Sequence, residues 1–169
     1  MKAVETLTAD RLRELLHYDP PTGVFTWRVH ASRRVRAGSV AGGSRVNGGG
    51  YRRISVAGVL YYAHRLAVLY MTGGWPTGEV DHRHGGRANN ALSNIRPVTR
   101  TVNAQNLRKP TARNKSGHLG VSFEKRRGKF VASICAAGTR TNLGYFDSAE
   151  AAGDAYLEAK RRLHEGCTL

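Results

Sequence analysis

Acidic side chains are scarce in this chain, and one long stretch has none. The 169 residues include 27 Lys and Arg against 12 Asp and Glu, which gives a formal net charge of +15. No Asp or Glu occurs from Pro20 to Gly78. A short basic run is typical of a solvated face, but so long a stretch without acids favours contact with nucleic acid. The arginines of this stretch are Arg28, Arg33, Arg34, Arg36, Arg45, Arg52, Arg53 and Arg65.

Cysteines and long apolar runs are also scarce. Cys135 and Cys167 are far apart and form no CxxC pair, so the sequence supports neither a disulfide framework nor a zinc ribbon. The longest apolar run, around Ala67–Met71, is far shorter than the roughly 20 residues that span a bilayer. The N-terminus has no apolar signal core. We therefore expect a cytoplasmic protein without membrane contact, since a membrane-surface protein would need a long amphipathic helix.

In the first half of the chain, hydrophobic periodicity predicts helices mixed with short strands. Leucines at helical spacing predict a helix over 8–17, and the alternating residues 24–29 predict a strand. Two further strands are expected on either side of Gly58, followed by a helix from about Ala63.

The second half predicts three strands and a closing helix. Turn signals at Arg127–Gly128 and Ala137–Gly138 separate the strands. Ser148 is suited to cap the start of a helix over 148–164, and Gly166 is suited to cap its end. Val121, Phe123, Phe130, Ala132 and Ile134 alternate as one apolar face that this helix can cover.

Residues 79–106 contain most of the side chains that could carry chemistry. Asp81 and His82 are adjacent, a Gly-rich turn follows, and a helix-like segment ends near Asn103. A carboxylate and an amide can hold one divalent metal ion, and an imidazole can activate a water molecule against a phosphodiester. Adjacent residues of an ideal strand point to opposite faces, so a bend after His82 is expected.

The segments AHRLAVLYMTGGWP and VDHRHGGRANNALSNIRPVTRTVNAQN, together with the preceding TGVFTWR, resemble the HNH endonucleases of the phage and intron-homing type. The resemblance covers roughly residues 20–106 and implies a ββα-metal nuclease fold. It implies Asp81 and Asn103 as ligands of Mg²⁺ or Mn²⁺ and His82 as the general base. It also implies that Asn94 braces the loop that aims the imidazole.

Other histidines and asparagines of this region allow different readings. His84 departs from the family pattern and is expected to be a surface residue, a phosphate contact or a modifier of metal preference. His64 is expected to support the core. Zinc binding by His64, His82 and His84 is a weaker alternative, because the usual cysteine partners are missing. Asn89 and Asn90 are expected to shape the turn.

The segment SGHLGVSFEKRRGKFVASICAAGTRTNLGYFDSAEAAGDAYLEA closely resembles the ethylene-response-factor (AP-two) DNA-binding domain. That resemblance implies a three-stranded antiparallel sheet packed on one helix, which reads DNA through the sheet. Several positions that carry arginine in plant members hold Ser122, Glu124, Ser133 and Cys135 here, so no sequence preference carries over. The DNA contacts expected across the whole chain are Arg52, Arg53, Arg65, Arg126, Arg127, Lys129, Arg140 and Asn142.

Together these patterns predict an α+β protein of two modules. We expect an HNH nuclease domain over residues 1–106, a basic linker over 107–117 and an AP-two-type domain over 118–169. The expected activity is metal-dependent hydrolysis of double-stranded DNA by a monomer, without a small-molecule cofactor. A non-catalytic DNA-binding protein on the same scaffold is one alternative. An RNA-binding or ribosome-associated protein is another, and it explains the charge but not the Asp81, His82 and Asn103 constellation.

Overall fold

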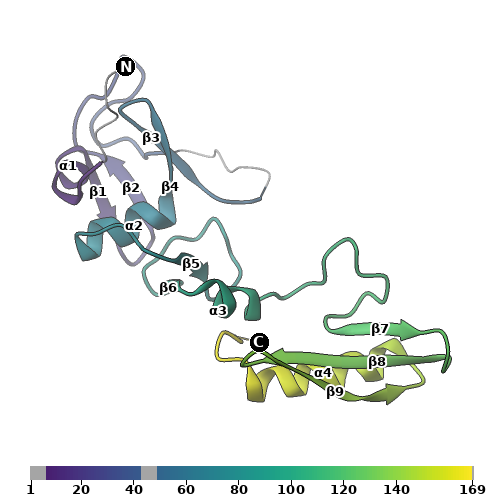
Figure 1. Cartoon of the computed structure of the whole chain (residues 1–169). Helices are drawn as coiled ribbons and strands as arrows, with labels where there is room; N and C mark the ends of the chain where they lie inside the picture. The colour runs from purple at the N-terminus through teal and green to yellow at the C-terminus, as the bar shows by residue number, and fades with distance from the viewer. Residues whose placement is uncertain (1–6, 43–48, 169) are drawn as a thin grey trace, which may run out of the picture. The chain divides into compact units, whose positions relative to one another are not determined.

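The computed structural model describes residues 7–42 and 49–168, and it confirms the α+β class (Figure 1). The backbone forms two compact units, Met1–Thr99 and Arg100–Leu169. The domain boundary expected near residue 106 remains a prediction. Within the described part, no helix is both long and apolar enough to cross a membrane.

In its described residues, 7–42 and 49–99, the first unit has three two-stranded antiparallel sheets and two helices. Its elements are α1 (Ala9–Leu15), β1 (Leu16–Asp19), β2 (Val24–Trp27), β3 (Arg53–Val56), β4 (Val59–Tyr62), α2 (Ala63–Thr72), β5 (Glu79–His82) and β6 (Ile95–Val98). The pairs are β1–β2, β3–β4 and β5–β6. One apolar core joins them, in which α2, with its buried Leu66, Ala67 and Leu69, packs against α1 and β4. As expected, two strands flank Gly58 and a helix begins at Ala63.

The first helix is shorter than the sequence predicts. Thr8 caps it, its side chain accepting a hydrogen bond from Arg11 N at 3.2 Å, but the helix ends at Leu15. Leu16 is extended, with φ −130° and ψ 145°, and pairs with Trp27. Leu16 and Tyr18 are both buried, so the apolar pattern here follows the period of a strand as well as that of a helix. Cross-strand pairing decides in favour of the strand.

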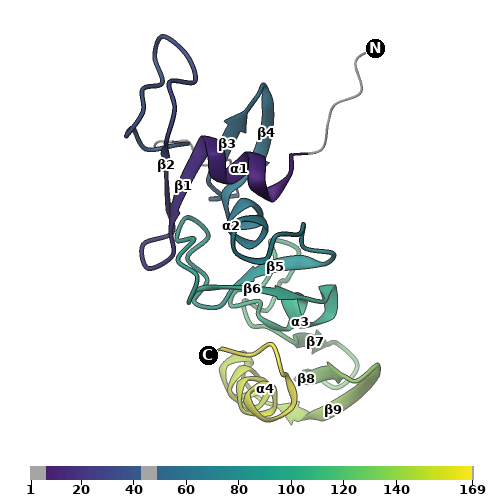
Figure 2. The ribbon, with the colours of Figure 1, turned by 90° about the vertical axis from the view of Figure 1, so that its left-hand side faces the viewer.

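The second unit has a three-stranded sheet covered by one long helix. Its elements are α3 (Arg100–Gln105), β7 (Val121–Glu124), β8 (Lys129–Ala136), β9 (Thr139–Phe146) and α4 (Ala149–Leu163), in the sheet order β7-β8-β9. Figures 1 and 2 show α4 along one face of this sheet. The predicted turns and the Ser148 cap are confirmed, and the Ser148 side chain accepts a hydrogen bond from Ala151 N at 3.1 Å.

Two details of the second unit differ from expectation. Phe123 is expected on the face that α4 covers, but it is 52% exposed. The buried cluster under α4 is formed by Val121, Ala132 and Ala152. Phe123 lies outside this cluster, edge-to-face on Phe130. Gly166 does not cap α4, which ends at an extended His164. Gly166 instead lies so close to α3 that a side chain there would collide with the carbonyl oxygen of Val102.

The C-terminal segment fixes α3 and the residues after it. Gly166 N donates to Gln105 Oε1 at 3.0 Å, and Arg108 Nη2 donates to Thr168 O at 3.0 Å. The buried Lys160 donates to Leu107 O, and burial lowers the pKa of its ammonium group. Because these contacts come from residues 160–168, the position of α3 depends on the last residues of the chain.

Gly166→Val should displace α3. A Cβ atom on Gly166 would lie 2.2 Å from Val102 O, so backbone must move, and forced overpacking of this kind costs about 1–3 kcal/mol. Hydrogen exchange of the amides of Asn106 and Leu107, which donate to the carbonyls of Asn103 and Ala104, should accelerate. The exposed neighbour variant Glu165→Ala is the control. Equal protection in both variants would contradict this role of Gly166.

Candidate active site

The β5–β6 hairpin places Asp81 and His82 at the end of β5. Asp81 pairs with Arg96 across the strands and His82 pairs with Ile95. The bend expected after His82 is present: Gly85 N donates to His82 O at 2.9 Å, and Gly85 takes a positive φ of 73°. Both polar side chains are buried, with Asp81 6% and His82 4% exposed. Buried polar groups require partners, so their contacts define the site.

A hydrogen bond with Asn90 and packing against other rings hold His82 in place. Its Nε2 atom lies 3.2 Å from Asn90 Oδ1. An amide oxygen only accepts, so Nε2 carries the hydrogen and donates it. In the neutral ring the lone pair is then on Nδ1. The ring of His64 crosses His82 edge-on with centroids 5.1 Å apart, and Tyr51 lies 5.7 Å away.

The surroundings of His82 favour its neutral form. Burial is the main cause and lowers the pKa of the imidazole, and the nearby Arg87 lowers it further. The hydrogen bond with Asn90 and the charge of Asp81 act in the opposite direction. Because the net shift is downward, His82 is neutral at pH 7 and can accept a proton.

Asp81 is charge-compensated and can contribute a metal ligand. Arg96 donates twice to Oδ2 of Asp81, from Nε at 3.1 Å and from Nη2 at 3.0 Å. Carboxylate oxygen is a hard donor that suits Mg²⁺ or Mn²⁺, so the side chain fits a divalent ion in chemical type. Asn103, the second expected ligand, is half-buried on α3 in the second unit.

Asn94 organises the loop between β5 and β6. The buried amide accepts from His84 N at 3.0 Å and donates to Asn89 O at 2.7 Å and Gly86 O at 3.4 Å. These bonds tie the two ends of the loop together. They are consistent with the bracing role expected from the sequence, although the roles of the individual site residues remain predictions.

Asn90 has a contact that the sequence does not reveal. Asn89 does shape the turn as expected, since its Oδ1 accepts from Ala91 N at 3.0 Å. Asn90, the most buried residue of the loop together with Asn94 at 1% exposure, turns its side chain to His82. Two adjacent asparagines have the same turn propensity, so no local signal separates the two roles.

Residues from three other parts of the chain contact the loop segment 88–91. Tyr18 Oη donates to Asn90 O at 2.8 Å, and Arg52 Nε donates to Ala88 O at 3.1 Å. Burial, with the neighbouring Asp19 charge, raises the pKa of Tyr18 to about 12, so the phenol keeps its proton. Gly23 approaches so closely that a Cβ there would lie 2.1 Å from Ala91 N. These contacts hold Asn90 against the imidazole.

Several expected site residues have other contacts. Arg52 supports the loop, and Arg65 donates to Gly78 O at 3.0 Å and Pro76 O at 2.9 Å, so both guanidinium groups bind backbone carbonyls. Arg53 is half-buried at the start of β3. His84 is exposed. Within residues 7–42 and 49–168, no three His, Cys, Asp or Glu side chains form a metal-binding group, so the zinc alternative gains no support there.

The expected DNA contacts of the second unit lie at the solvent-facing side or at turns of its sheet. Arg126, Arg127, Arg140 and Asn142 are exposed, and Lys129 is half-buried. Arg127 lies over the Tyr145 ring at 4.3 Å. Lys129 pairs with Asp147 at 2.9 Å, and Arg140 Nη2 donates to Ser133 Oγ at 2.9 Å. The structure thus brings these side chains onto one sheet.

His64 is buried beside His82 without a partner for its Nδ1 atom among the described residues. Tyr62 stacks on its ring, with centroids 5.4 Å apart. Burial, together with the nearby His82 ring and the charge of Arg65, lowers the pKa of His64 to about 4. The core role expected for His64 is consistent with this position.

The first unit should lose stability in mild acid because of His64. The unfolded chain binds a proton near pH 6.5 and the folded ring only near 4, so the contribution is complete above 6.5 and is lost as the pH falls toward 4. From pH 7 to 5 the loss should be about 2 kcal/mol of unfolding free energy. Urea unfolding of His64→Phe should show a loss smaller by that amount, and equal losses in both proteins would contradict the assignment.

Part of this chain is similar to proteins that are already known. Residues 61–105 match the family model described as HNH endonuclease, and this segment includes Asp81, His82, Asn94 and Asn103. A solved structure described as DNA binding and cleavage by the HNH homing endonuclease I-HmuI is 22% identical, with a TM-score of 0.45, covering 89% of this chain and 88% of that one. No curated protein matches significantly. Over residues 61–105, this chain is therefore similar to the HNH endonuclease family.

Proposed function

We propose that this protein is a divalent-metal-dependent endonuclease that hydrolyses double-stranded DNA. The observation that carries the proposal is the buried His82, which follows Asp81 on β5, whose Nε2 is fixed by Asn90 and whose pKa is lowered by burial. The HNH family match over residues 61–105 and the net charge of +15 support the same activity. A purely DNA-binding role does not require a neutral imidazole preorganised next to a carboxylate.

In this proposal, His82 acts as the general base. Its Nδ1 lone pair takes a proton from water, the water oxygen forms a bond to phosphorus, and the bond from phosphorus to the 3′ oxygen breaks. The products are a 5′-phosphate and a 3′-hydroxyl that takes its proton from solvent. Asn90 keeps the imidazole ring of His82 in the tautomer that leaves Nδ1 unprotonated. Asn94 keeps the loop around the ring in place.

Asp81 and Asn103 would hold the metal ion. A carboxylate and an amide oxygen are ligands that Mg²⁺ and Mn²⁺ accept. When bound, such an ion stabilises negative charge on the phosphate and on the leaving oxygen. Arg96 offsets the buried charge of Asp81 and restrains its carboxylate, since it donates twice to one oxygen.

The second unit would position the protein on DNA through its three-stranded sheet. Its AP-two-like pattern, the turn arginines Arg126 and Arg127, and the outward Arg140 and Asn142 support this role. Because each chain contains one His82, a monomer would cut one strand per binding event. A non-catalytic DNA-binding protein on the same scaffold is the runner-up, and titratable cleavage of plasmid decides against it. RNA binding is the third candidate, and competition by duplex RNA against duplex DNA tests it.

His82→Ala should abolish most cleavage while metal-free DNA affinity stays near wild type. Loss of a general base typically lowers a rate about 10²–10⁴-fold. The matched control is His84→Ala, which removes an exposed imidazole two residues away and should cut at close to the wild-type rate. Plasmid nicking under single-turnover conditions measures both. Cleavage by His82→Ala within a few-fold of wild type would show that another group activates the water.

Asp81→Ala and Asn103→Ala should each raise the Mg²⁺ concentration needed for half-maximal cleavage. Each substitution removes one oxygen ligand, so excess metal should restore part of the rate. Asp10→Ala is the control, because it removes an exposed carboxylate and changes the net charge as Asp81→Ala does. Full activity of the wild-type protein in EDTA, or an unchanged metal requirement in both variants, would refute the metal site.

A further inference from the structure

The segment that follows β2 folds into an ordered arm, defined here as residues 28–39. Trp27 N donates to Ser39 O at 2.9 Å and Gly38 N donates to Trp27 O at 2.7 Å, which closes the base of the arm. Farther out, Ala31 N donates to Val35 O at 3.0 Å, and Ser32 and Val35 form an antiparallel bridge. Figure 2 shows this segment extending beyond the end of β2. The arm is therefore a hairpin-like excursion with Arg33 and Arg34 at its tip.

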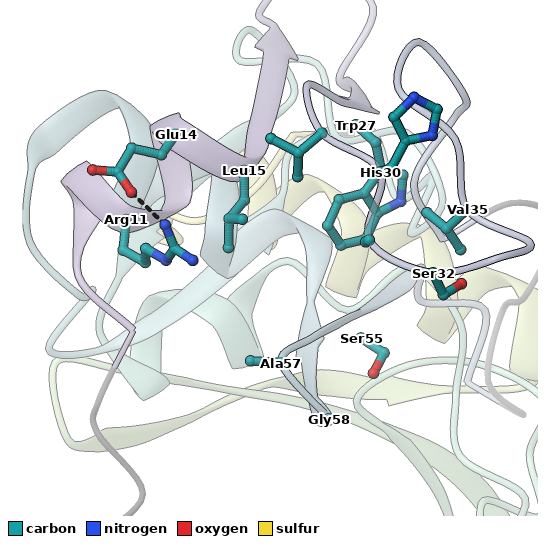
Figure 3. A pocket seen from close by; sticks show the side chains of 12 residues that line it. Arg11, Glu14, Leu15, Trp27, His30, Ser32, Val35, Ser55, Ala57 and Gly58 are labelled. Atoms are coloured by element: carbon teal, nitrogen blue, oxygen red, sulfur yellow. Dashed lines mark hydrogen bonds and ion pairs between the residues drawn. The ribbon is translucent and has the colours of Figure 1, made fainter.

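One apolar side chain anchors the arm to the first unit. Val35 is half-buried and packs against the core. With Leu15 and Trp27 it lines a cavity of about 650 Å³, in which Figure 3 shows Val35 and Trp27 on the same side. Because Val35 follows the two tip arginines directly, its anchoring restricts where their backbone can move.

The arm carries only positive charge. Arg28, Arg33, Arg34 and Arg36 are all exposed, and no acidic residue occurs between Pro20 and Gly78. None of these four guanidinium groups has an ion pair or hydrogen bond to a described residue. Arg52 and Arg65, in contrast, bind backbone carbonyls within the fold. The arm thus presents four exposed cations without a partner among the described residues.

Like charges held close together on an ordered segment repel one another, and a polyanion removes that repulsion. Duplex DNA presents about one negative charge per 1.7 Å of its axis. The planar guanidinium group can donate two hydrogen bonds to one phosphate. A prearranged hairpin also loses less conformational entropy on binding than a disordered basic tail would.

We propose that the arginine arm is a DNA-binding surface of the first unit that contacts the phosphate backbone of duplex DNA. This inference rests on the proposed function, because the partner is the substrate of the same unit. Arg33 and Arg34 make the central contacts at the tip, and Arg28 and Arg36 flank them. The arm supplies affinity that does not depend on base sequence.

The test compares three double variants of the full chain in metal-free buffer with a fixed DNA duplex. Arg33→Gln/Arg34→Gln removes the two tip charges. Arg161→Gln/Arg162→Gln removes two exposed charges from the end of α4, so both proteins have the same net charge. Arg33→Lys/Arg34→Lys keeps the tip charges. The measured quantity is the slope of the logarithm of the binding constant against the logarithm of salt concentration.

Removing the tip arginines should lower the magnitude of this slope by about 1.8, since each lost phosphate contact contributes about 0.9. The α4 variant and the lysine variant should keep the wild-type slope. An equal fall in the two glutamine variants would reduce the effect to net charge and overturn the proposal. A loss of affinity for duplex RNA larger than that for duplex DNA would overturn the choice of partner.

The outcome is separable from that of the proposed function. If the wild-type protein shows the arm-dependent slope but never cleaves DNA with Mg²⁺ or Mn²⁺, the nuclease assignment fails and the arm stands. If the protein cleaves DNA but all variants share one slope, the arm fails and the nuclease assignment stands.

Discussion

The first unit depends on burying two adjacent polar side chains, Asp81 and His82, at the end of one strand. A buried polar group without a partner costs several kcal/mol, so each must be satisfied within the fold. Arg96 on the paired strand satisfies Asp81, and Asn90 in the loop satisfies His82. The second contact forms only if the whole loop between β5 and β6 takes one shape, which explains why so many residues hold it.

That requirement reaches well beyond the hairpin. Tyr18 comes from β1, Gly23 from the turn before β2 and Arg52 from the segment before β3, and all three fix residues 88–91. The N-terminal strands thus act as a scaffold that aims one imidazole. The same burial lowers the pKa of His82, so the packing that positions the base also keeps it in the form that accepts a proton.

The sequence predicts local features well and long-range contacts poorly. The strands around Gly58, the helix from Ala63, the turns of the C-terminal sheet and the Ser148 cap are set by turn residues and periodicity, and the structure has them. The predicted end of the first helix, at residue 17, is wrong, because pairing of Leu16 with Trp27 outweighs helical periodicity.

The long-range contacts at the functional sites are missed for the same reason. Arg52 and Arg65 are expected on DNA from charge alone, yet their guanidinium groups bind backbone carbonyls that are 36 and 13 residues away in the chain. Asn90 carries no local signal that separates it from Asn89. Gly166 follows the pattern of a helix cap, but its contact with Val102 depends on tertiary packing. Each case requires knowledge of which distant backbone lies beside the residue.

The protonation state of His82 tests the central claim most directly. Nitrogen-15 NMR of the metal-free protein at pH 7 distinguishes the two neutral tautomers from the imidazolium ion. Burial lowers the pKa of His82, so the ring should be neutral. Because Asn90 Oδ1 can only accept, its hydrogen should lie on Nε2 and the lone pair on Nδ1. A ring protonated on both nitrogens, or a neutral ring with its hydrogen on Nδ1, would contradict the account of this residue as a preorganised base.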